Sequence, residues 1–224
     1  MVFFVKAKDI GEAWIKAVLA VLNHGKWVEK EDSRILEVED MVIEVEDLGM
    51  PKKHPEPLMN VGSLYTDKQL EEYAKQYFEA DTKGFTYTYG ERLRAYRCPF
   101  CNAVIDQIDF IKAKLSKFPS TNQAVAVLYN PLKDPDKERH NDPPCWNWVQ
   151  FRLRNGELHV TALFRSHDYC KGLYPNLYAI AKLAESIHKG SRKLVLISTS
   201  AHIYESDYRA AQKHVGPYNA IYRI

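Results

Sequence analysis

Long apolar runs, abundant cysteine and an excess of one charge are all missing from this sequence. No stretch approaches the ~20 uninterrupted apolar residues that a membrane-spanning helix requires, and residues 1–6 become charged at once, unlike a signal peptide. Four cysteines among 224 residues do not form a disulfide framework and are better explained as thiols in a reducing compartment. We therefore expect a cytoplasmic protein with no membrane segment.

The charged residues are nearly balanced, with 31 lysines and arginines against 29 aspartates and glutamates and a formal net charge of +2. This balance argues against a dedicated nucleic-acid-binding protein, which needs a dominant basic face. It is compatible with a small anionic ligand, because two or three well-placed cations are enough to bind one. Hydrophobic residues make up 46% of the chain, so a sizeable core can form.

Helical and strand patterns alternate along the chain without an internal repeat, a low-complexity segment or a linker. The simplest organisation is a single domain over residues 1–224 of the α/β class (α+β type), with a mixed β-sheet packed against helices. Apolar spacing predicts helices at 10–22, 67–79, 104–117 and 175–188. Period-two patterns and short apolar runs predict a strand or hairpin at 34–46 and strands at 124–129, 148–154, 157–164 and 193–198, with loops at 48–62 and 131–144.

Local signals mark several boundaries of these elements. Residues 24–25 are typical of a helix end, Asp67 is a candidate N-cap, and Pro175 is typical of a first helical residue. Asn155-Gly156 lies between two predicted strands and is the strongest short hairpin signal that a sequence offers.

Cys145 lies at the boundary between a polar loop and a predicted strand, where α/β sheets expose reactive groups. The alternative is a small buried hydrophobic residue. A nucleophilic cysteine needs a nearby cation that favours the thiolate. Asn155 and Gly156 lie midway between Cys145 and Arg165, so a regular hairpin places the thiol and the guanidinium roughly opposite each other.

Several motifs between residues 85 and 205 carry a family resemblance. In chain order they are Tyr89-Gly90-Glu91-Arg92-Leu93-Arg94, Ile105-Asp106-Gln107-Ile108, Asp142-Pro143-Pro144-Cys145, Phe164-Arg165-Ser166-His167-Asp168-Tyr169 with Gly172 and Pro175-Asn176, and Ser200-Ala201-His202-Ile203-Tyr204. With these motifs the sequence resembles thymidylate synthase, most closely the short archaeal-type members of that family. The resemblance implies a thymidylate synthase-like fold and a homodimer whose active sites share residues.

The resemblance also implies the reductive methylation of dUMP to dTMP. Cys145 would add to C6 of dUMP and make C5 a nucleophile toward the one-carbon unit of 5,10-methylene-tetrahydrofolate or a methanopterin-type analogue. The same co-substrate would supply a hydride, so no metal would be needed. Asp168 and Gly172 would bind the pterin. Tyr89 would line the site and help to remove the C5 proton, although a core role in an aromatic-rich segment is the alternative.

The remaining roles that the resemblance implies concern the nucleotide. Arg165 and Ser166 would bind its phosphate, and Asn176 would bind the N3/O4 edge of the base, since an amide is donor and acceptor at once. His202 and Tyr204 would hold the ribose hydroxyl. Structural alternatives exist for these residues. Arg165 would be a surface arginine on a strand, and Asn176 would cap its own helix. His202 and Tyr204 would be ordinary residues at a sheet edge.

The sequence departs from the family pattern at the phosphate. Most members bring two further arginines from the partner subunit, where this chain has Asn122 and Gln123. Each charge-assisted contact is typically worth about 1.5–3 kcal/mol, so their loss matters. Three explanations are open. The lost charge is supplied by Arg34, Lys112 or Arg92, the ligand is a different one, or the affinity for phosphate is low.

Other departures concern single residues. Glu56 is the nearest carboxylate to the glutamate that organises water in the family, and Trp146 follows the nucleophile where bacterial members usually have histidine. Cys98 and Cys101 form a CxxC pair that suits a zinc or redox site, but no second pair completes four zinc ligands. A tight turn before the 104–117 helix is the simpler interpretation.

Two alternative functions stay open. The first is a pyrimidine nucleotide hydroxymethylase of the same superfamily, in which water replaces hydride. Asn176 favours uracil, whereas an aspartate is expected where that branch acts on cytosine. The second is a catalytically inactive nucleotide-binding homologue, motivated by Asn122 and Gln123.

Overall fold

The computed structural model describes residues 2–49, 66–82, 84–98, 100–135 and 143–222. Its strands are β1 (Phe3–Ala7), β2 (Lys26–Glu29), β3 (Arg34–Val45), β4 (Tyr96–Arg97), β5 (Val104–Ile105), β6 (Val125–Val127), β7 (Trp146–Arg154), β8 (Glu157–Phe164), β9 (His167–Asp168) and β10 (Arg192–Tyr204). Its helices are α1 (Ile10–His24), α3 (Asp67–Lys75), α4 (Tyr89–Arg94), α5 (Gln107–Lys117), α6 (Leu173–Ile187), α7 (Glu205–Val215), the 3₁₀ helix η2 (Gly216–Tyr218) and α8 (Asn219–Tyr222).

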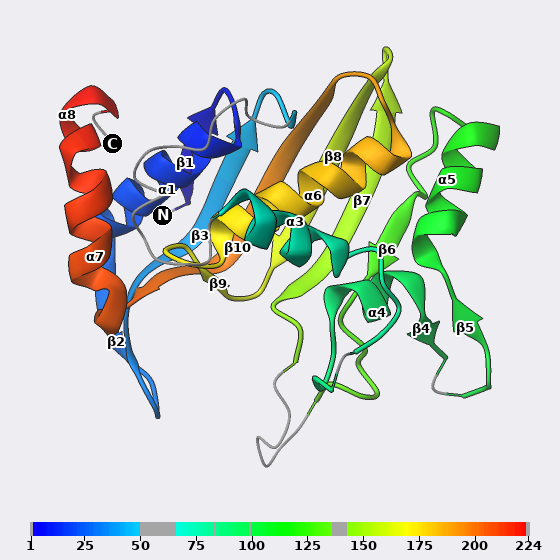
Figure 1. The fold of residues 1–224 in the computed structure, drawn as a ribbon, viewed down its shortest axis with the longest axis horizontal. Helices are drawn as coiled ribbons and strands as arrows, with labels where there is room; N and C mark the ends of the chain where they lie inside the picture. Colours follow the sequence, from blue (N-terminus) through cyan, green and yellow to red (C-terminus); the bar gives the residue numbers. More distant parts are fainter. Residues whose placement is uncertain (1, 50–65, 83, 99, 136–142, 223–224) are drawn as a thin grey trace.

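The described strands form one mixed eight-stranded sheet and a separate pair, β4–β5. The large sheet runs in the order β1-β3-β10-β8-β7-β6, with β2 added to β3 and β9 added to β10 (Figure 1). Strand β10 is central: it pairs antiparallel with β3 and parallel with β8 and β9. The predicted class, a mixed sheet packed with helices, is therefore confirmed.

The core lies on one face of this sheet. Along β8, buried residues alternate with half-buried ones, as the period of two in a strand requires: Leu158, Val160, Ala162 and Phe164 are buried. Helices α1, α3 and α6 lie over that face (Figure 1). Ten residues of α1 and eleven of α6 are buried, so these two helices contribute much of the core.

Helix α1 confirms the predicted helix at 10–22 and extends it to His24. Asp9 caps its start by accepting a hydrogen bond from the Glu12 amide, and the Gly25 amide donates to the Val21 carbonyl at its end. The predicted strand at 34–46 is also confirmed as β3, which forms a hairpin with β2. The predicted strand at 124–129 is present as the shorter β6.

The predicted N-cap of α3 and the predicted first residue of α6 were wrong. Thr66, not Asp67, caps α3, because its hydroxyl and the Gln69 side chain form a reciprocal capping box, and the helix ends at Lys75. Helix α6 begins at Leu173, so that Pro175 lies in the first turn, where a missing amide hydrogen is tolerated.

The predicted helix at 104–117 was wrong over its first residues. Val104 and Ile105 pair with Arg97 and Tyr96 as strand β5, and the helix starts only after Asp106, whose carboxylate accepts from the Asp109 amide. β-branched residues favour the strand, and an N-capping aspartate then begins the helix.

The predicted strand at 193–198 is only half of β10, which continues to Tyr204. Pairing with β3 holds this extension as far as the Tyr204–Ile35 pair, and β9 pairs with Ala201 and His202 on the other side. Residues 50–62 of the predicted loop at 48–62, and 136–142 of the loop at 131–144, lie outside the described part of the chain.

Candidate active site

The β7–β8 hairpin turns at Asn155-Gly156, as predicted, and both residues have positive φ angles of 52° and 79°. Arg154 therefore pairs with Glu157, and a strictly regular hairpin would place residue 166 opposite Cys145. An irregularity between Trp146 and Trp148 shifts the register by one residue.

This shift places Arg165 opposite Cys145, and the predicted pairing is confirmed. The Arg165 amide donates a 2.9 Å hydrogen bond to the Cys145 carbonyl. The Arg165 side chain turns back over the same segment: its Nη2 donates to the Pro143 carbonyl at 2.6 Å and its Nε to the Pro144 carbonyl at 3.2 Å. A permanently charged guanidinium thus braces the segment that leads into the cysteine.

The Cys145 thiol is neither sealed in the core nor fully exposed. It is half-buried and packs against the edge of the hydrophobic core. Burial raises the pKa of Tyr73 to about 12 and that of Tyr89 far above its ordinary value, and nearby Cys145 adds to both increases in pKa. The thiol therefore lies within electrostatic range of two phenols, one from α3 and one from the start of α4.

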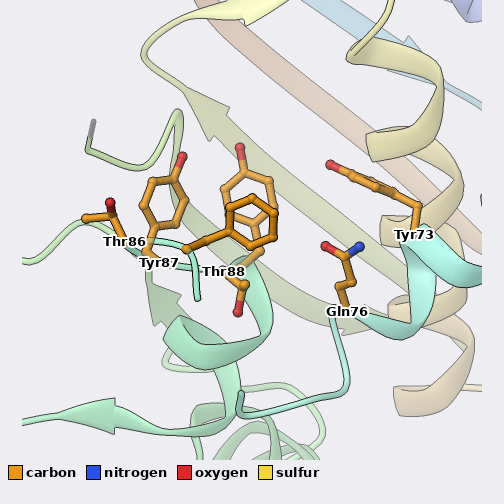
Figure 2. Close-up of a pocket in the computed structure, with 7 residues that line it drawn as sticks. Tyr73, Gln76, Thr86, Tyr87 and Thr88 are labelled. Carbon is orange, nitrogen blue, oxygen red and sulfur yellow. The ribbon is translucent and has the colours of Figure 1, made fainter. Parts of the chain in front are cut away.

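Both of these tyrosines line a pocket of about 340 Å³. Figure 2 shows Tyr73 and Gln76 on one side of it and Thr86, Tyr87 and Thr88 on the other. Its volume lies within the roughly 300–1,000 Å³ range of small-molecule sites.

A second hollow, of about 270 Å³, lies where α3 meets the start of α6. Lys171, Gly172 and Pro175 line it from the α6 side. It shares Tyr73 and Gln76 with the first pocket, so the two spaces adjoin at Tyr73.

Asn176 lies in the first half of α6 with only 5% of its surface exposed. Its Oδ1 accepts hydrogen bonds from the hydroxyls of Tyr73 (2.6 Å) and Tyr77 (2.8 Å). Its Nδ2 lies 2.9 Å from Nε2 of His167. The amide that the resemblance assigns to the base is therefore bound to the tyrosine that the two pockets share.

His202, on β10, has a buried nitrogen without a partner. The residue is 2% exposed, and its Nε2 makes no hydrogen bond to any residue in the described ranges. Burial lowers its pKa to about 4, so the ring is neutral near pH 7. Nδ1 lies 3.4 Å from the Ser200 carbonyl, which leaves the lone pair on Nε2 as an unused acceptor. Tyr204 stands edge-on to this ring at 5.1 Å.

Asp168 lies on β9, directly beside His202 on β10. Burial raises the pKa of its carboxyl group, while its Oδ1 accepts from the Cys170 amide at 2.9 Å and the Lys171 amide at 3.2 Å. Gly172 follows this turn, and a side chain there would put a Cβ only 2.9 Å from the Asp168 carbonyl oxygen. Only glycine fits this close approach.

Most of the predicted site residues thus occur on a few neighbouring elements. Cys145 directly precedes β7 and Arg165 directly follows its partner β8. Ser166 is half-buried just before β9, and Asp168 and Asn176 flank the turn that leads into α6. His202 and Tyr204 lie on the adjacent strand β10, and Tyr89 approaches Cys145 from α4.

Three residues near the site were not predicted: Tyr73, Tyr77 and His167. The two tyrosines are four residues apart on the predicted 67–79 helix, and this spacing places them on one helix face. No local signal connects that face to Asn176, about 100 residues away. His167 lies inside a recognised motif, but nothing in the motif shows that its ring is buried.

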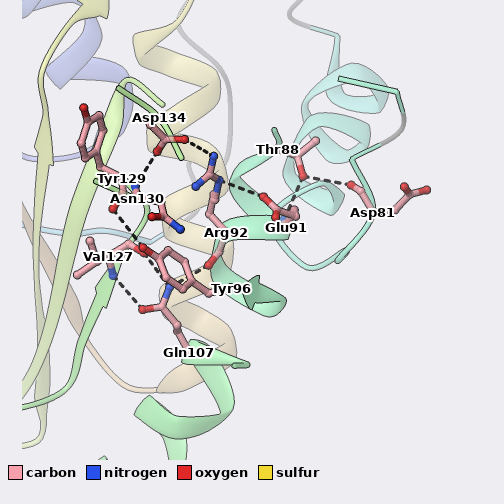
Figure 3. Close-up of polar contacts among 10 residues, drawn as sticks. All are labelled: Asp81, Thr88, Glu91, Arg92, Tyr96, Gln107, Val127, Tyr129, Asn130 and Asp134. Carbon is pink, nitrogen blue, oxygen red and sulfur yellow. Dashed lines mark hydrogen bonds and ion pairs between the residues drawn. The ribbon is translucent and has the colours of Figure 1, made fainter. Parts of the chain in front are cut away.

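Of the three cations considered for the phosphate, Arg92 is already paired with two carboxylates. Its side chain is 3% exposed and is held by Asp134 at 2.5 Å and Glu91 at 3.0 Å (Figure 3). Figure 3 also shows Gln107 joining the Arg92 carbonyl to the Val127 backbone. These contacts hold α4, α5 and β6 together, while Tyr89 at the start of α4 lines the first pocket.

The other cations have different surroundings. Arg34 forms ion pairs with Glu29 and Glu205 at the start of β3, next to the Tyr204–Ile35 pair. Lys112 is half-buried on α5. Asn122, at one of the two positions where the family pattern has arginine, accepts a 2.5 Å hydrogen bond from Arg154, so a guanidinium from β7 lies beside that position.

The remaining departures also have structural explanations. Trp146 is fully buried and its ring stacks on Phe164 at 5.7 Å, so it belongs to the core. Cys98 and Cys101 lie in the connection between β4 and β5, so they precede a strand and not, as predicted, the helix directly. Across the described ranges no group of three potential ligands could hold a metal ion. Glu56 lies outside those ranges.

These features define a class of protein: an α/β protein with a cysteine and an arginine at paired strand ends beside an aromatic pocket. The family follows from comparison with known proteins. The sequence matches the family model for thymidylate synthase over residues 54–219. The chain therefore belongs to the thymidylate synthase family.

Relatives from methanogenic archaea agree with this family. A protein of Methanosarcina barkeri named "Putative thymidylate synthase" is 37% identical over 211 residues, which cover 91% of this chain and 90% of that protein. A protein of the same name in Methanosarcina acetivorans is 34% identical over 213 residues, which cover 91% of this chain and 90% of that protein. Another in Methanococcoides burtonii is 33% identical over 216 residues, which cover 93% of each chain. The part of this chain described by the structure contains no helix long and apolar enough to cross a membrane.

Proposed function

We propose that this chain is a thymidylate synthase that converts dUMP to dTMP, with Cys145 as the nucleophile. The observation that carries the proposal is the half-buried thiol directly before β7, opposite Arg165 and within electrostatic range of two pocket-lining tyrosines. Because the reaction needs a reduced thiol, we place the enzyme in the cytoplasm, and we treat residues 1–224 as one functional domain.

The chemistry begins when the Cys145 thiolate forms a bond to C6 of the base, which moves the electron pair of the C5–C6 double bond toward C5. C5 then bonds to the one-carbon unit, which is still attached to a nitrogen of the pterin. The C5 proton leaves through water beside Tyr89 as that carbon–nitrogen bond breaks, which leaves an exocyclic methylene at C5. The pterin co-substrate, methylene-tetrahydrofolate or a methanopterin-type analogue, thus supplies the one-carbon unit, then gives a hydride to this methylene and leaves as the dihydropterin. Release of Sγ from C6 restores the double bond and frees dTMP.

The nucleotide lies with its phosphate toward Arg165 and Ser166 and its ribose toward β10. The unpartnered Nε2 of His202 accepts the hydrogen bond of a ribose hydroxyl, with Tyr204 beside it. A buried polar atom left without a partner costs about 1–3 kcal/mol, so a ligand hydroxyl at this nitrogen is favourable. Asn176 binds the N3/O4 edge of uracil once the Tyr73 hydroxyl is displaced.

The pterin occupies the hollow between α3 and α6. The hollow is lined by Tyr73, Gly172 and Pro175, which offer apolar surface to a flat heteroaromatic ring. Polar residues complete the lining and can meet the polar edges of the ring: Gln69, Glu72, Gln76 and Lys171. Asp168, next to this turn, contacts the pterin ring as the resemblance implies. The described residues therefore fit such a co-substrate.

We extend the proposal to a homodimer formed through the sheet face that points away from α1, α3 and α6. One row of exposed or half-buried apolar residues crosses that face in direct cross-strand register. Its members are Phe4, Val42, Ile197, Leu163, Trp148 and Val127. Such a row is typical of an interface. A sedimentation experiment that finds only monomer at micromolar concentration would contradict it.

Tritium release from dUMP labelled at C5 tests the proposed reaction. The purified chain should release tritium to water only with a methylene-tetrahydropterin present, and both pterin types should be tried. A Cys145→Ser variant should release none, because an alcohol adds far less readily to C6. No release from the wild-type chain with either pterin would leave the inactive homologue as the better explanation.

A further inference from the structure

A buried chain of hydrogen bonds surrounds the Asn176 amide. Two tyrosine hydroxyls donate to its Oδ1, and its Nδ2 faces Nε2 of His167 at 2.9 Å. The other ring nitrogen of His167, Nδ1, lies 3.3 Å from the hydroxyl oxygen of Ser198, which also accepts from Tyr169 at 3.1 Å. Ser198 is fully buried and His167 is 2% exposed, so bulk water does not compete at this end.

The His167 ring is held in place as well as buried. It stacks on Phe164 with a centroid distance of 4.1 Å and an angle of 8° between the planes. Its backbone belongs to β9, which pairs with β10 at Ala201. The stacked ring and the paired backbone together keep the imidazole next to Asn176.

Burial also determines the protonation of this ring. It lowers the pKa of His167 to about 3, so the imidazole is neutral at physiological pH. A neutral imidazole has one donor and one acceptor nitrogen. Because Asn176 Nδ2 can only donate, Nε2 is the acceptor and the proton is on Nδ1, where the Ser198 hydroxyl oxygen accepts it.

The orientation of an amide determines which pyrimidine it accepts. Uracil presents an N3–H donor beside an O4 acceptor, whereas cytosine presents an N3 acceptor beside an N4 donor. The arrangement at Asn176 offers Oδ1 on the pocket side, where the half-buried Tyr73 hydroxyl now occupies it, and leaves the second Nδ2 hydrogen for O4. To accept cytosine the amide would have to flip, which would bring Oδ1 against the lone pair of His167 Nε2.

We propose that His167 is a positioning residue that holds the Asn176 amide in the orientation that accepts uracil and rejects cytosine. The inference rests on the proposed function, because it assumes that Asn176 binds the base. His167 acts through Asn176 and touches neither substrate nor co-substrate. Selectivity for the base thus depends on a residue outside the direct contacts.

Matched substitutions at one position test this inference. His167→Phe keeps the stack on Phe164 but removes the acceptor, and His167→Gln keeps an acceptor oxygen near the place of Nε2. Calorimetric titration gives the dissociation constants of dUMP and dCMP for each protein, and selectivity is the dCMP constant divided by the dUMP constant. This ratio should fall about tenfold in His167→Phe, the equivalent of one buried hydrogen bond. It should remain within about threefold of wild type in His167→Gln.

The outcomes separate the inference from the proposed function. If the wild-type chain does not bind dUMP, the proposed function fails. If it binds dUMP and the folded His167→Phe variant discriminates as well as wild type, only the role of His167 is refuted. Nitrogen-15 NMR of the wild-type imidazole covers the case in which the variants do not fold. The Nδ1–H tautomer supports the inference, and the Nε2–H tautomer overturns it.

Discussion

Two buried histidines should make this protein less stable in weak acid. Burial lowers the pKa of His167 to about 3 and that of His202 to about 4, whereas an unfolded histidine titrates near 6.5. Below pH 6.5 the unfolded chain therefore binds protons that the folded chain refuses. The free energy of unfolding must fall as the pH falls from about 6.5 toward 4.

The size of this effect follows from the same pKa values. Between pH 7 and pH 5, each histidine lowers the free energy of unfolding by about 2 kcal/mol, and the two together by about 4 kcal/mol. That is a large share of the roughly 5–15 kcal/mol that stabilises a typical domain. Carboxylates with lowered pKa, such as Glu12 and Glu71, lose their contribution mainly at lower pH.

A His202→Gln variant isolates one of the two contributions. Urea unfolding at pH 7 and pH 5, followed by the fluorescence of the four tryptophans, gives both free energies for each protein. The loss between the two pH values should be about 2 kcal/mol smaller in the variant than in wild type, because all other titrations are shared. Equal losses in the two proteins would refute the assignment of His202 as buried and neutral.

Three further predictions concern other residues of the site and its support. Arg165→Lys should weaken dUMP binding about 10- to 100-fold in calorimetry, because lysine lacks the planar guanidinium with its paired donors. An unchanged affinity would show that Arg165 does not bind the phosphate. Asp134→Ala should lower the free energy of unfolding by about 3–5 kcal/mol, since it removes one partner of buried Arg92. A loss below about 1 kcal/mol in urea unfolding would contradict that role. Gly172→Ala should raise the KM for the pterin more than that for dUMP. The new Cβ would meet the Asp168 carbonyl oxygen and shift the turn that lines the proposed pterin hollow. Equal effects on both KM values would argue against a pterin there.

The parts of the fold that follow local rules could be predicted from the sequence. Asn155-Gly156 identified the hairpin, and the hairpin brought Arg165 to Cys145 because strand pairing has a fixed register. The regular apolar spacing of α1 and α6 likewise required little beyond the period of a helix. Even there, the one-residue shift that places Arg165 opposite Cys145 comes from a strand irregularity that no local pattern indicates.

The parts that depend on distant partners could not be predicted. Polar residues 198–200 interrupt the apolar pattern of β10, and the strand continues only because β3 and β9 pair with it. The surroundings of Asn176 come from Tyr73 and Tyr77 on one side and His167 on the other, a convergence that only the folded chain creates. Propensity describes short segments, whereas sites are assembled by tertiary contacts.

The most direct test of the central claim is a covalent trap at Cys145. Incubation with 5-fluoro-dUMP and a methylene-tetrahydropterin should halt the reaction after C6 and C5 have both formed bonds, because fluorine at C5 cannot leave as a proton does. Digestion and mass spectrometry should then find the peptide that contains Cys145 carrying both nucleotide and pterin, with the peptides of Cys98, Cys101 and Cys170 unmodified. A Cys145 peptide that stays unmodified at saturating concentrations of both ligands would contradict the account.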